Sequence, residues 1–148
     1  MVTIWVDADG CPVVNQTIQI ASKYQLDVWL VCDTSHEYHR EGARTLVVSK
    51  GRDSADFVLV NRICKNDIVI TQDYGLAAMC LAKQAVVINQ DGMRYNEFNI
   101  DSLLLARHTA RKIRNSGGRL KGPSKRTEQQ NKIFQRELEQ LVINQFEI

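Results

Sequence analysis

The chain has 148 residues, 44% of them hydrophobic and 24% charged, with a formal net charge of +2. A chain of this length can bury roughly two thirds of the surface that its unfolded form exposes, so it needs no disulfide or structural metal to fold. No apolar run approaches the roughly 20 residues that span a membrane, and acids follow a β-rich start where a signal peptide would have basic residues and a long apolar segment. We therefore expect a cytoplasmic protein.

The first predicted strand ends in two acids. Residues 3–6 are a β-rich apolar run, which Asp7 and Asp9 follow in the sequence Asp-Ala-Asp-Gly-Cys-Pro. Ligands bind outside the carboxyl ends of strands in open α/β sheets, so both acids are candidate site residues. Apolar residues at helical spacing predict a helix whose first position is Pro12. Asp9 has an alternative role as a turn or cap residue.

The next apolar run predicts a parallel sheet. Residues 27–32 are almost continuously apolar, as in a strand that is buried on both faces. Residues 33–44 are polar and aperiodic and predict a loop, followed by a short strand at 45–48. His36 and His39 lie in this loop without a third nitrogen or sulfur ligand nearby. We expect them to be solvated or to face a substrate, and not to form a zinc site.

Two more acids lie near the start of a helix predicted over residues 53–63. Asp53 and Asp56 are three residues apart, a spacing that lets both side chains point toward the same place. Acids in a first helical turn also stabilise the helix dipole, by about 0.3 to 1 kcal/mol each. The sequence leaves both roles open.

Residues 67–73 predict a second buried strand that ends in an acid. The sequence Asp-Ile-Val-Ile-Thr-Gln-Asp precedes a good helix over residues 75–82. This repeats the first strand and helix and brings Asp73 to the same edge of the sheet as Asp7. Thr71 can hydrogen-bond an acid or a ligand there. A further strand is predicted at 85–88 and a turn at 90–92.

Basic residues are concentrated in the last third of the chain. We predict a helix with one buried side over residues 100–115, a basic glycine-rich segment over 116–126, and an amphipathic helix over 127–146 that starts with Thr-Glu-Gln-Gln and returns to the core. We expect residues 1–148 to form a single domain. No Asp or Glu interrupts the predicted nucleic-acid-binding residues, which are Arg107, Arg111, Lys112, Arg114, Arg119, Lys121, Lys125 and Arg126.

The four cysteines do not predict a disulfide framework or a zinc site, since they are widely spaced and form no Cys-x-x-Cys pair. Cys32, Cys64 and Cys80 lie in apolar runs and are expected to be reduced thiols in the core. Cys11 lies beside the acidic edge at a predicted helix start. The helix dipole favours its thiolate there, but Asp7 and Asp9 oppose it.

Carboxylates gathered at one sheet edge repel one another unless they share a cation. Mg²⁺ and Mn²⁺ prefer oxygen ligands, and such a bound metal lowers the pKa of a water and stabilises the charge that develops on a phosphodiester. We therefore predict a metal-dependent hydrolytic site with Thr71 as an auxiliary residue. The predicted metal ligands are Asp7, Asp9, Asp53, Asp56 and Asp73, and all of them except Asp9 are predicted catalytic residues.

The motifs Asp-Ala-Asp-Gly-Cys-Pro, Asp-Ser-Ala-Asp, Val-Ile-Thr-Gln-Asp-Tyr-Gly-Leu-Ala and Gly-Gly-x-x-x-Gly-Pro together resemble the YaiI/YqxD family of uncharacterised bacterial proteins, over nearly the whole chain. That family resembles PIN domains, which are three-layer α/β/α sandwiches with a mainly parallel central sheet and are commonly Mg²⁺- or Mn²⁺-dependent ribonucleases. The resemblance implies that Asp7 is the strand-end acid, Asp53 or Asp56 the helix acid and Asp73 the acid of Thr-x-Asp, with Asp9 as an auxiliary ligand.

This chain departs from the family pattern at two places. The family often has Ala where this chain has Gly10. It also often has Arg-Asp-Arg where this chain has Arg126-Thr127-Glu128. The second departure leaves open whether the basic segment contributes to the site.

Two other functions remain open. A haloacid-dehalogenase-like phosphatase would use Asp7 as nucleophile and Asp9 as acid, but residues 71–73 lack the second acid of that group's later motif. A catalytically silent nucleic-acid-binding module would use the basic residues alone. The expected partner is nucleic acid, with RNA favoured, and not a membrane. A homo-oligomer is compatible with the sequence.

Overall fold

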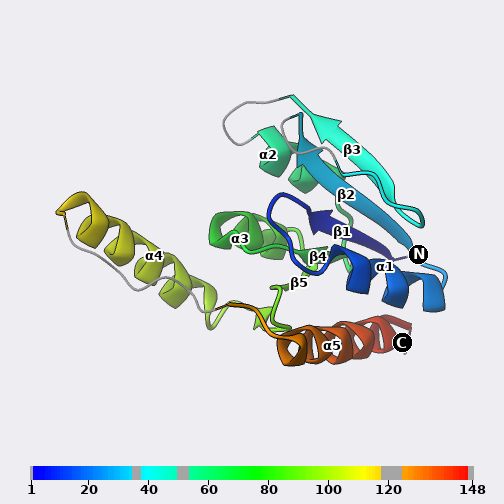
Figure 1. Ribbon diagram of the computed structural model, residues 1–148. Helices are drawn as coiled ribbons and strands as arrows, with labels where there is room; N and C mark the ends of the chain where they lie inside the picture. The colour runs from blue at the N-terminus through cyan, green and yellow to red at the C-terminus, as the bar shows by residue number, and fades with distance from the viewer. Residues whose placement is uncertain (1, 35–37, 50–53, 118–124, 147–148) are drawn as a thin grey trace.

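The computed structural model describes residues 2–34, 38–49, 54–117 and 125–146 (Figure 1). Apolar runs form the strands, and amphipathic or apolar segments form the helices between them. In chain order the elements are β1 (Thr3–Asp7), α1 (Val14–Lys23), β2 (Asp27–Asp33), β3 (Arg44–Val48), α2 (Ser54–Arg62), β4 (Ile68–Ile70), α3 (Tyr74–Ala82), β5 (Val86–Ile88), β6 (Arg94–Tyr95), α4 (Ile100–Asn115) and α5 (Glu128–Phe146).

The strands form a six-stranded sheet in the order β3-β2-β1-β4-β5-β6. Strands β1 to β5 pair in parallel and β6 pairs antiparallel with β5, across a turn in which Gly92 has φ +85°. The predicted α/β class with a mainly parallel central sheet is confirmed. The order of the strands reverses between β1 and β4, and the carboxyl ends of strands at such a point are where open α/β sheets bind ligands.

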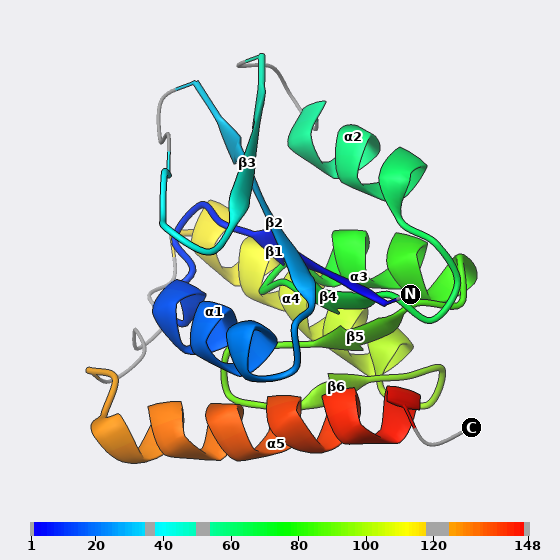
Figure 2. The same ribbon diagram turned by 90° about the vertical axis from the view of Figure 1, so that its right-hand side faces the viewer.

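Helices cover both faces of the sheet and make three layers. Figures 1 and 2 show α1 and α5 together on one face and α2 and α3 on the other. Side chains alternate along β1, so Ile4 and Val6 pack with Phe134 and Leu138 of α5, while Trp5 packs in the opposite core. No helix in the described ranges is both long and apolar enough to cross a membrane.

Helix α4 packs on the body mainly at its start, and most of its later side chains are exposed, which corrects the prediction of one buried side. Ile100 is its buried residue, Leu103 and Leu104 are partly buried, and Leu105 and Ile113 are 65% and 40% exposed. Figure 1 shows why: α4 contacts α3 at its start and then extends away from the sheet. Farther along, Arg107 reaches Asp73, but most other side chains of α4 are exposed.

Two local predictions are also corrected. Helix α1 starts at Val14, so Pro12 lies in the turn before it and is not the first helical residue. Cys32 and Cys80 are buried as expected, but Cys64 is exposed, because it lies after the end of α2 and not within an element.

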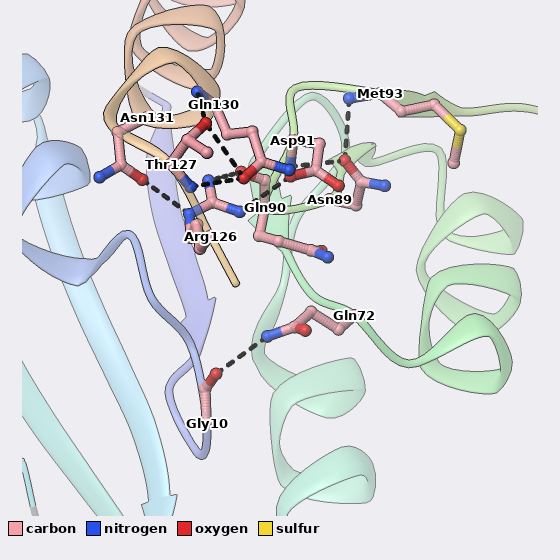
Figure 3. Close-up of polar contacts among 10 residues, drawn as sticks. All are labelled: Gly10, Gln72, Asn89, Gln90, Asp91, Met93, Arg126, Thr127, Gln130 and Asn131. Atoms are coloured by element: carbon pink, nitrogen blue, oxygen red, sulfur yellow. Dashed lines mark hydrogen bonds and ion pairs between the residues drawn. The ribbon is translucent and has the colours of Figure 1, made fainter. Parts of the chain in front are cut away.

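The start of α5 is held by a capping box and by one arginine (Figure 3). The Thr127 amide donates to Gln130 Oε1 at 2.7 Å, and the Gln130 amide donates to Thr127 Oγ1 at 3.3 Å, as the Thr-Glu-Gln-Gln start predicts. Arg126 donates to Asp91 at 2.8 Å, to the Gln90 carbonyl and to Asn131 at 2.7 Å. Arg126 thus ties α5 to the turn between β5 and β6.

Asp67 joins β1 to β4 at the amino ends of these strands. Its carboxylate is buried and accepts hydrogen bonds from the Thr3 amide at 3.0 Å, from Trp5 Nε1 at 3.1 Å and from the Cys64 amide at 2.9 Å. The Trp5 Nε1–H group is buried, so it would lack any partner if this acceptor were lost. Asp67 is therefore a structural acid, distant from the edge where the other strand-end acids lie.

We predict that Asp67→Ala lowers the free energy of unfolding by about 2 to 3 kcal/mol, because it leaves the buried Trp5 Nε1–H without an acceptor and removes two further hydrogen bonds. Asp67→Asn keeps one acceptor oxygen and is expected to lose less. Urea unfolding followed by tryptophan fluorescence measures both changes. Asp27→Ala, at an exposed position on β2, is the control and should change stability little. Equal losses for Asp67→Ala and Asp27→Ala would contradict the structural role of Asp67.

Candidate functional site

A cleft of about 680 Å³ opens at the carboxyl ends of β1, β2 and β4, where the order of the strands reverses. Its walls come from loops after these strands, from the first turns of α2 and α3, and from α4. Carboxylates dominate its described lining, and Arg107 is the cation among them. The acids are Asp7, Asp9, Asp33, Asp56 and Asp73.

Thr71 holds the two principal strand-end acids in place. Its Oγ1 donates to Asp7 Oδ2 at 2.8 Å and accepts a hydrogen bond from the Asp73 amide at 3.0 Å. The Thr71 backbone is itself fixed, since its amide donates to the Ile88 carbonyl at 3.1 Å and its carbonyl accepts from the Tyr95 hydroxyl at 3.2 Å. The buried Thr71 therefore determines where the Asp7 carboxylate lies.

Asp73 has a structural role as well as a place in the cleft. It is the N-cap of α3, and its Oδ1 accepts hydrogen bonds from the amides of Gly75 at 2.8 Å and Leu76 at 3.2 Å. Arg107 Nη1 of α4 approaches the same oxygen to 3.5 Å. These contacts use Oδ1, so the second oxygen, Oδ2, can serve as a ligand without loss of the cap.

The cleft raises the pKa of Asp7 to about 6 from an ordinary 3.8. Burial is the largest cause, and the charges of Asp56, Asp73 and Asp9 add to it, whereas the hydrogen bond from Thr71 acts in the opposite direction. Ionising Asp7 therefore costs more in the folded protein than in water. The repulsion expected among strand-end acids contributes to this cost, but burial contributes more.

The cleft brings together most of the acids predicted from the sequence, namely Asp7, Asp9, Asp56 and Asp73. Asp53 lies outside the described residues. Asp33 lines the cleft but was assigned to a loop in the sequence analysis. The missed signal was its position, because Asp33 follows the apolar run of its strand as Asp7 follows that of β1.

The predicted basic residues are divided by the structure. Arg107 lines the cleft, Arg111, Lys112 and Arg114 are exposed farther along α4, and Lys125 is exposed before α5. Arg119 and Lys121 lie outside the described residues. The side chain of Arg126 is 21% exposed and bonds to Asp91, so it has an evident structural role.

The other reactive side chains considered from the sequence contribute less. Burial, as the largest cause, raises the pKa of the Cys11 thiol to about 11, so Cys11 is a neutral thiol at pH 7. His39 is exposed and lies outside the described lining of the cleft, and His36 is not among the described residues.

The carboxylates of the cleft are the kind of ligand that the predicted Mg²⁺ or Mn²⁺ prefers. Within the described ranges, no three Asp, Glu, His or Cys side chains already form a group that could hold a metal ion. Mg²⁺ in proteins often takes one or two carboxylates and completes its shell with waters, so a preformed group of three is not required. The donors are all carboxylate oxygens, and a cation would relieve the repulsion on Asp7. The residues present fit a hydrated Mg²⁺ or Mn²⁺.

Comparison with known proteins gives a family match over almost the entire fold. A family model described as "Uncharacterized BCR, YaiI/YqxD family" matches residues 5–144. The chain is 49% identical over 139 residues to a UPF0178 protein of Exiguobacterium sibiricum, covering 94% of this chain and 95% of that protein. It is 45% identical over 135 residues to a UPF0178 protein of Ruminiclostridium cellulolyticum, covering 91% and 88%. No solved structure matches the chain.

We predict that Asp7→Asn stabilises the metal-free protein at neutral pH. Because the pKa of Asp7 is higher in the folded state, ionising this group costs stability as pH rises from about 4 to about 6, up to about 3 kcal/mol above that range. Asparagine carries no charge and keeps an acceptor for Thr71. The gain should therefore be present at pH 7 and absent below about pH 4.

Urea unfolding in EDTA across this pH range measures the gain. Asp27→Asn, which removes one exposed carboxylate at the amino end of β2, is the matched control. An Asp7→Asn protein that is no more stable than wild type at pH 7 would show that the cleft does not disfavour this charge.

Proposed function

The chain belongs to the YaiI/YqxD family, and we propose that it is a divalent-metal-dependent nuclease that hydrolyses phosphodiester bonds, with RNA as the favoured substrate. The observation that carries this proposal is the cleft in which several aspartates and Arg107 meet at the reversal of the strand order. The predicted resemblance of the family to PIN domains supports the same reaction class.

In this proposal the acids of the cleft hold Mg²⁺ or Mn²⁺. Asp7 and the free Oδ2 of Asp73 are the principal ligands, and Asp56 approaches from α2. Asp9 and Asp33 line the same space and can accept hydrogen bonds from metal-bound waters. When bound, the metal supplies a water of lowered pKa and neutralises negative charge on the phosphodiester.

Side chains of the protein set the geometry of this site. Thr71 keeps Asp7 in one orientation through the 2.8 Å hydrogen bond, so that little reorganisation is needed when a cation binds. The N-cap bonds of Asp73 do the same for the second carboxylate. Arg107 lies where it can exchange Asp73 for a phosphate oxygen, which gives the substrate a positive contact in an otherwise acidic cleft.

The charge of α4 supports a polyanionic substrate. After Asp101 this helix has no acid, and its exposed Arg111, Lys112 and Arg114 extend the positive charge beyond the cleft. Basic side chains that neutralise phosphates release counterions, so binding should weaken steeply with salt. An acidic cleft beside a basic helix suits a phosphodiester chain better than a small phosphate monoester.

We predict cleavage of a labelled single-stranded RNA oligonucleotide with Mg²⁺ or Mn²⁺ and no cleavage in EDTA. Asp7→Asn and Asp73→Asn should each lower the rate by about 100-fold or more, because each removes a preorganised charge from the site. Asparagine is also a good N-cap, so Asp73→Asn should stay folded. Asp27→Asn, distant from the cleft, should cleave as wild type does.

The same experiment separates the competing functions. Cleavage that survives both EDTA and Asp73→Asn would rule out this mechanism. A phosphoryl group trapped covalently on Asp7 would instead identify a phosphatase that uses this residue as its nucleophile. If the protein binds RNA but cleaves it under no metal condition, the result would favour a nucleic-acid-binding module without catalytic activity.

A further inference from the structure

We propose that a groove along α4 binds the single-stranded segment that flanks the phosphodiester held in the cleft, with Tyr74 as a base-stacking platform and Arg114 as a phosphate contact. The groove has a volume of about 270 Å³ and is lined by Tyr74, Ala106, Arg107, Ala110 and Arg114. Tyr74 and Arg107 also line the acidic cleft, so the two spaces share a wall. This inference rests on the proposed function and names the form of its substrate.

The spacing along α4 gives the groove its shape. Ala106 and Ala110 are four residues apart and lie on one helix face, where their small side chains leave room. Arg107 and Arg114 are seven residues apart, which is two turns and a rise of about 10.5 Å. The helix therefore places one arginine at the cleft and another farther out, with a small-residue floor beside them.

Tyr74 is fixed at the junction of the two spaces. It is the first residue of α3 and is half-buried. Its ring packs edge-on against Tyr95, with ring centroids 6.1 Å apart and planes at 65°. An aromatic ring held in this way beside a basic groove is a platform on which a base can stack, whatever its sequence.

Gly75 lies beside the contact between Asp73 and Arg107. A Cβ atom at this position would lie 3.3 Å from Asp73 Oδ1, a tight approach, and 3.8 Å from Arg107 Nη1, an ordinary van der Waals distance. A side chain here would therefore crowd the Asp73 carboxylate and not Arg107. Glycine keeps uncrowded the Asp73 oxygen that Arg107 approaches.

The size and charge of the groove favour a single strand. A space of about 270 Å³ can receive part of one strand. Its charged lining residues, Arg107 and Arg114, are cationic, which complements a phosphate backbone. Unpaired bases are also the ones that can stack on an aromatic side chain.

The test is binding of a fluorescein-labelled RNA 12-mer in EDTA, measured by anisotropy at several salt concentrations. Arg114→Ala should reduce the salt slope by about 0.7, the value for one lost phosphate contact on a single strand. Tyr74→Leu should weaken binding by about tenfold without changing the slope, whereas Tyr74→Phe keeps the ring and should bind as wild type does. The duplex form of the same oligonucleotide should bind more weakly than the single strand.

Arg136→Ala is the matched control, because it removes the same charge from an exposed position on α5 and should leave the slope unchanged. Thermal melting shows whether each variant is folded. Any of three results would overturn the inference. They are a salt slope that is unaltered in a folded Arg114→Ala protein, equal affinity of the Tyr74→Leu and Tyr74→Phe variants, and tighter binding of the duplex than of the single strand. A DNA 12-mer of the same sequence tests whether the groove needs the 2′-hydroxyl.

Failure of this inference is distinguishable from failure of the proposed function. Binding in EDTA does not depend on catalysis. If the predicted binding pattern is seen without metal-dependent cleavage, the groove inference is supported and the proposed nuclease function is wrong. Metal-dependent cleavage with unaltered binding in the Tyr74→Leu and Arg114→Ala variants would keep the nuclease and reject the groove.

Discussion

The pairing of β1 with β4 is the constraint on which the site depends. These strands are far apart in the chain, and carboxylates join them at both ends of their contact. Asp67 accepts from Thr3 and Trp5 at the amino ends, and Asp7 accepts from Thr71 at the carboxyl ends. The order of the strands reverses between β1 and β4. The loops that follow these two strands therefore lead in opposite directions and leave an opening between them.

The acids at the two ends of the β1–β4 pairing, Asp67 and Asp7, lie in different environments. Asp67 is surrounded by N–H donors and serves the fold, whereas the pKa of Asp7 is raised by burial first and then by the charges of three nearby carboxylates. Burying charge without enough compensation costs stability, and proteins concentrate such costs at functional sites. In the proposed function this acidic cleft receives a cation, and Arg107 and α4 provide the opposite charge for a phosphate chain.

Much of this arrangement could be predicted along the chain. Apolar runs ending in Asp7 and Asp73 predicted the strands and the shared edge, because parallel strands bring their carboxyl ends together. The role of Asp33 was missed although the same signal was present, and the role of Arg126 could not be predicted in this way. Asp33 begins a polar stretch that conceals its place at the end of β2, and Arg126 lies in a basic run although it bonds to Asp91, 35 residues away. Helix periodicity likewise predicted α4 but not the exposure of most of its later side chains.

The sequence by itself determined the α/β class, the order of the elements apart from β6, the family and most of the candidate acids, because apolar periodicity and strand-end residues are local properties. Only the tertiary structure decided that β4 pairs with β1, that Thr71 links Asp7 to Asp73, and that α4 brings Arg107, near its middle, to Asp73 in the cleft. These features depend on contacts between distant segments. Packing and hydrogen bonds between distant segments stabilise these features, and a local sequence pattern does not predict such contacts.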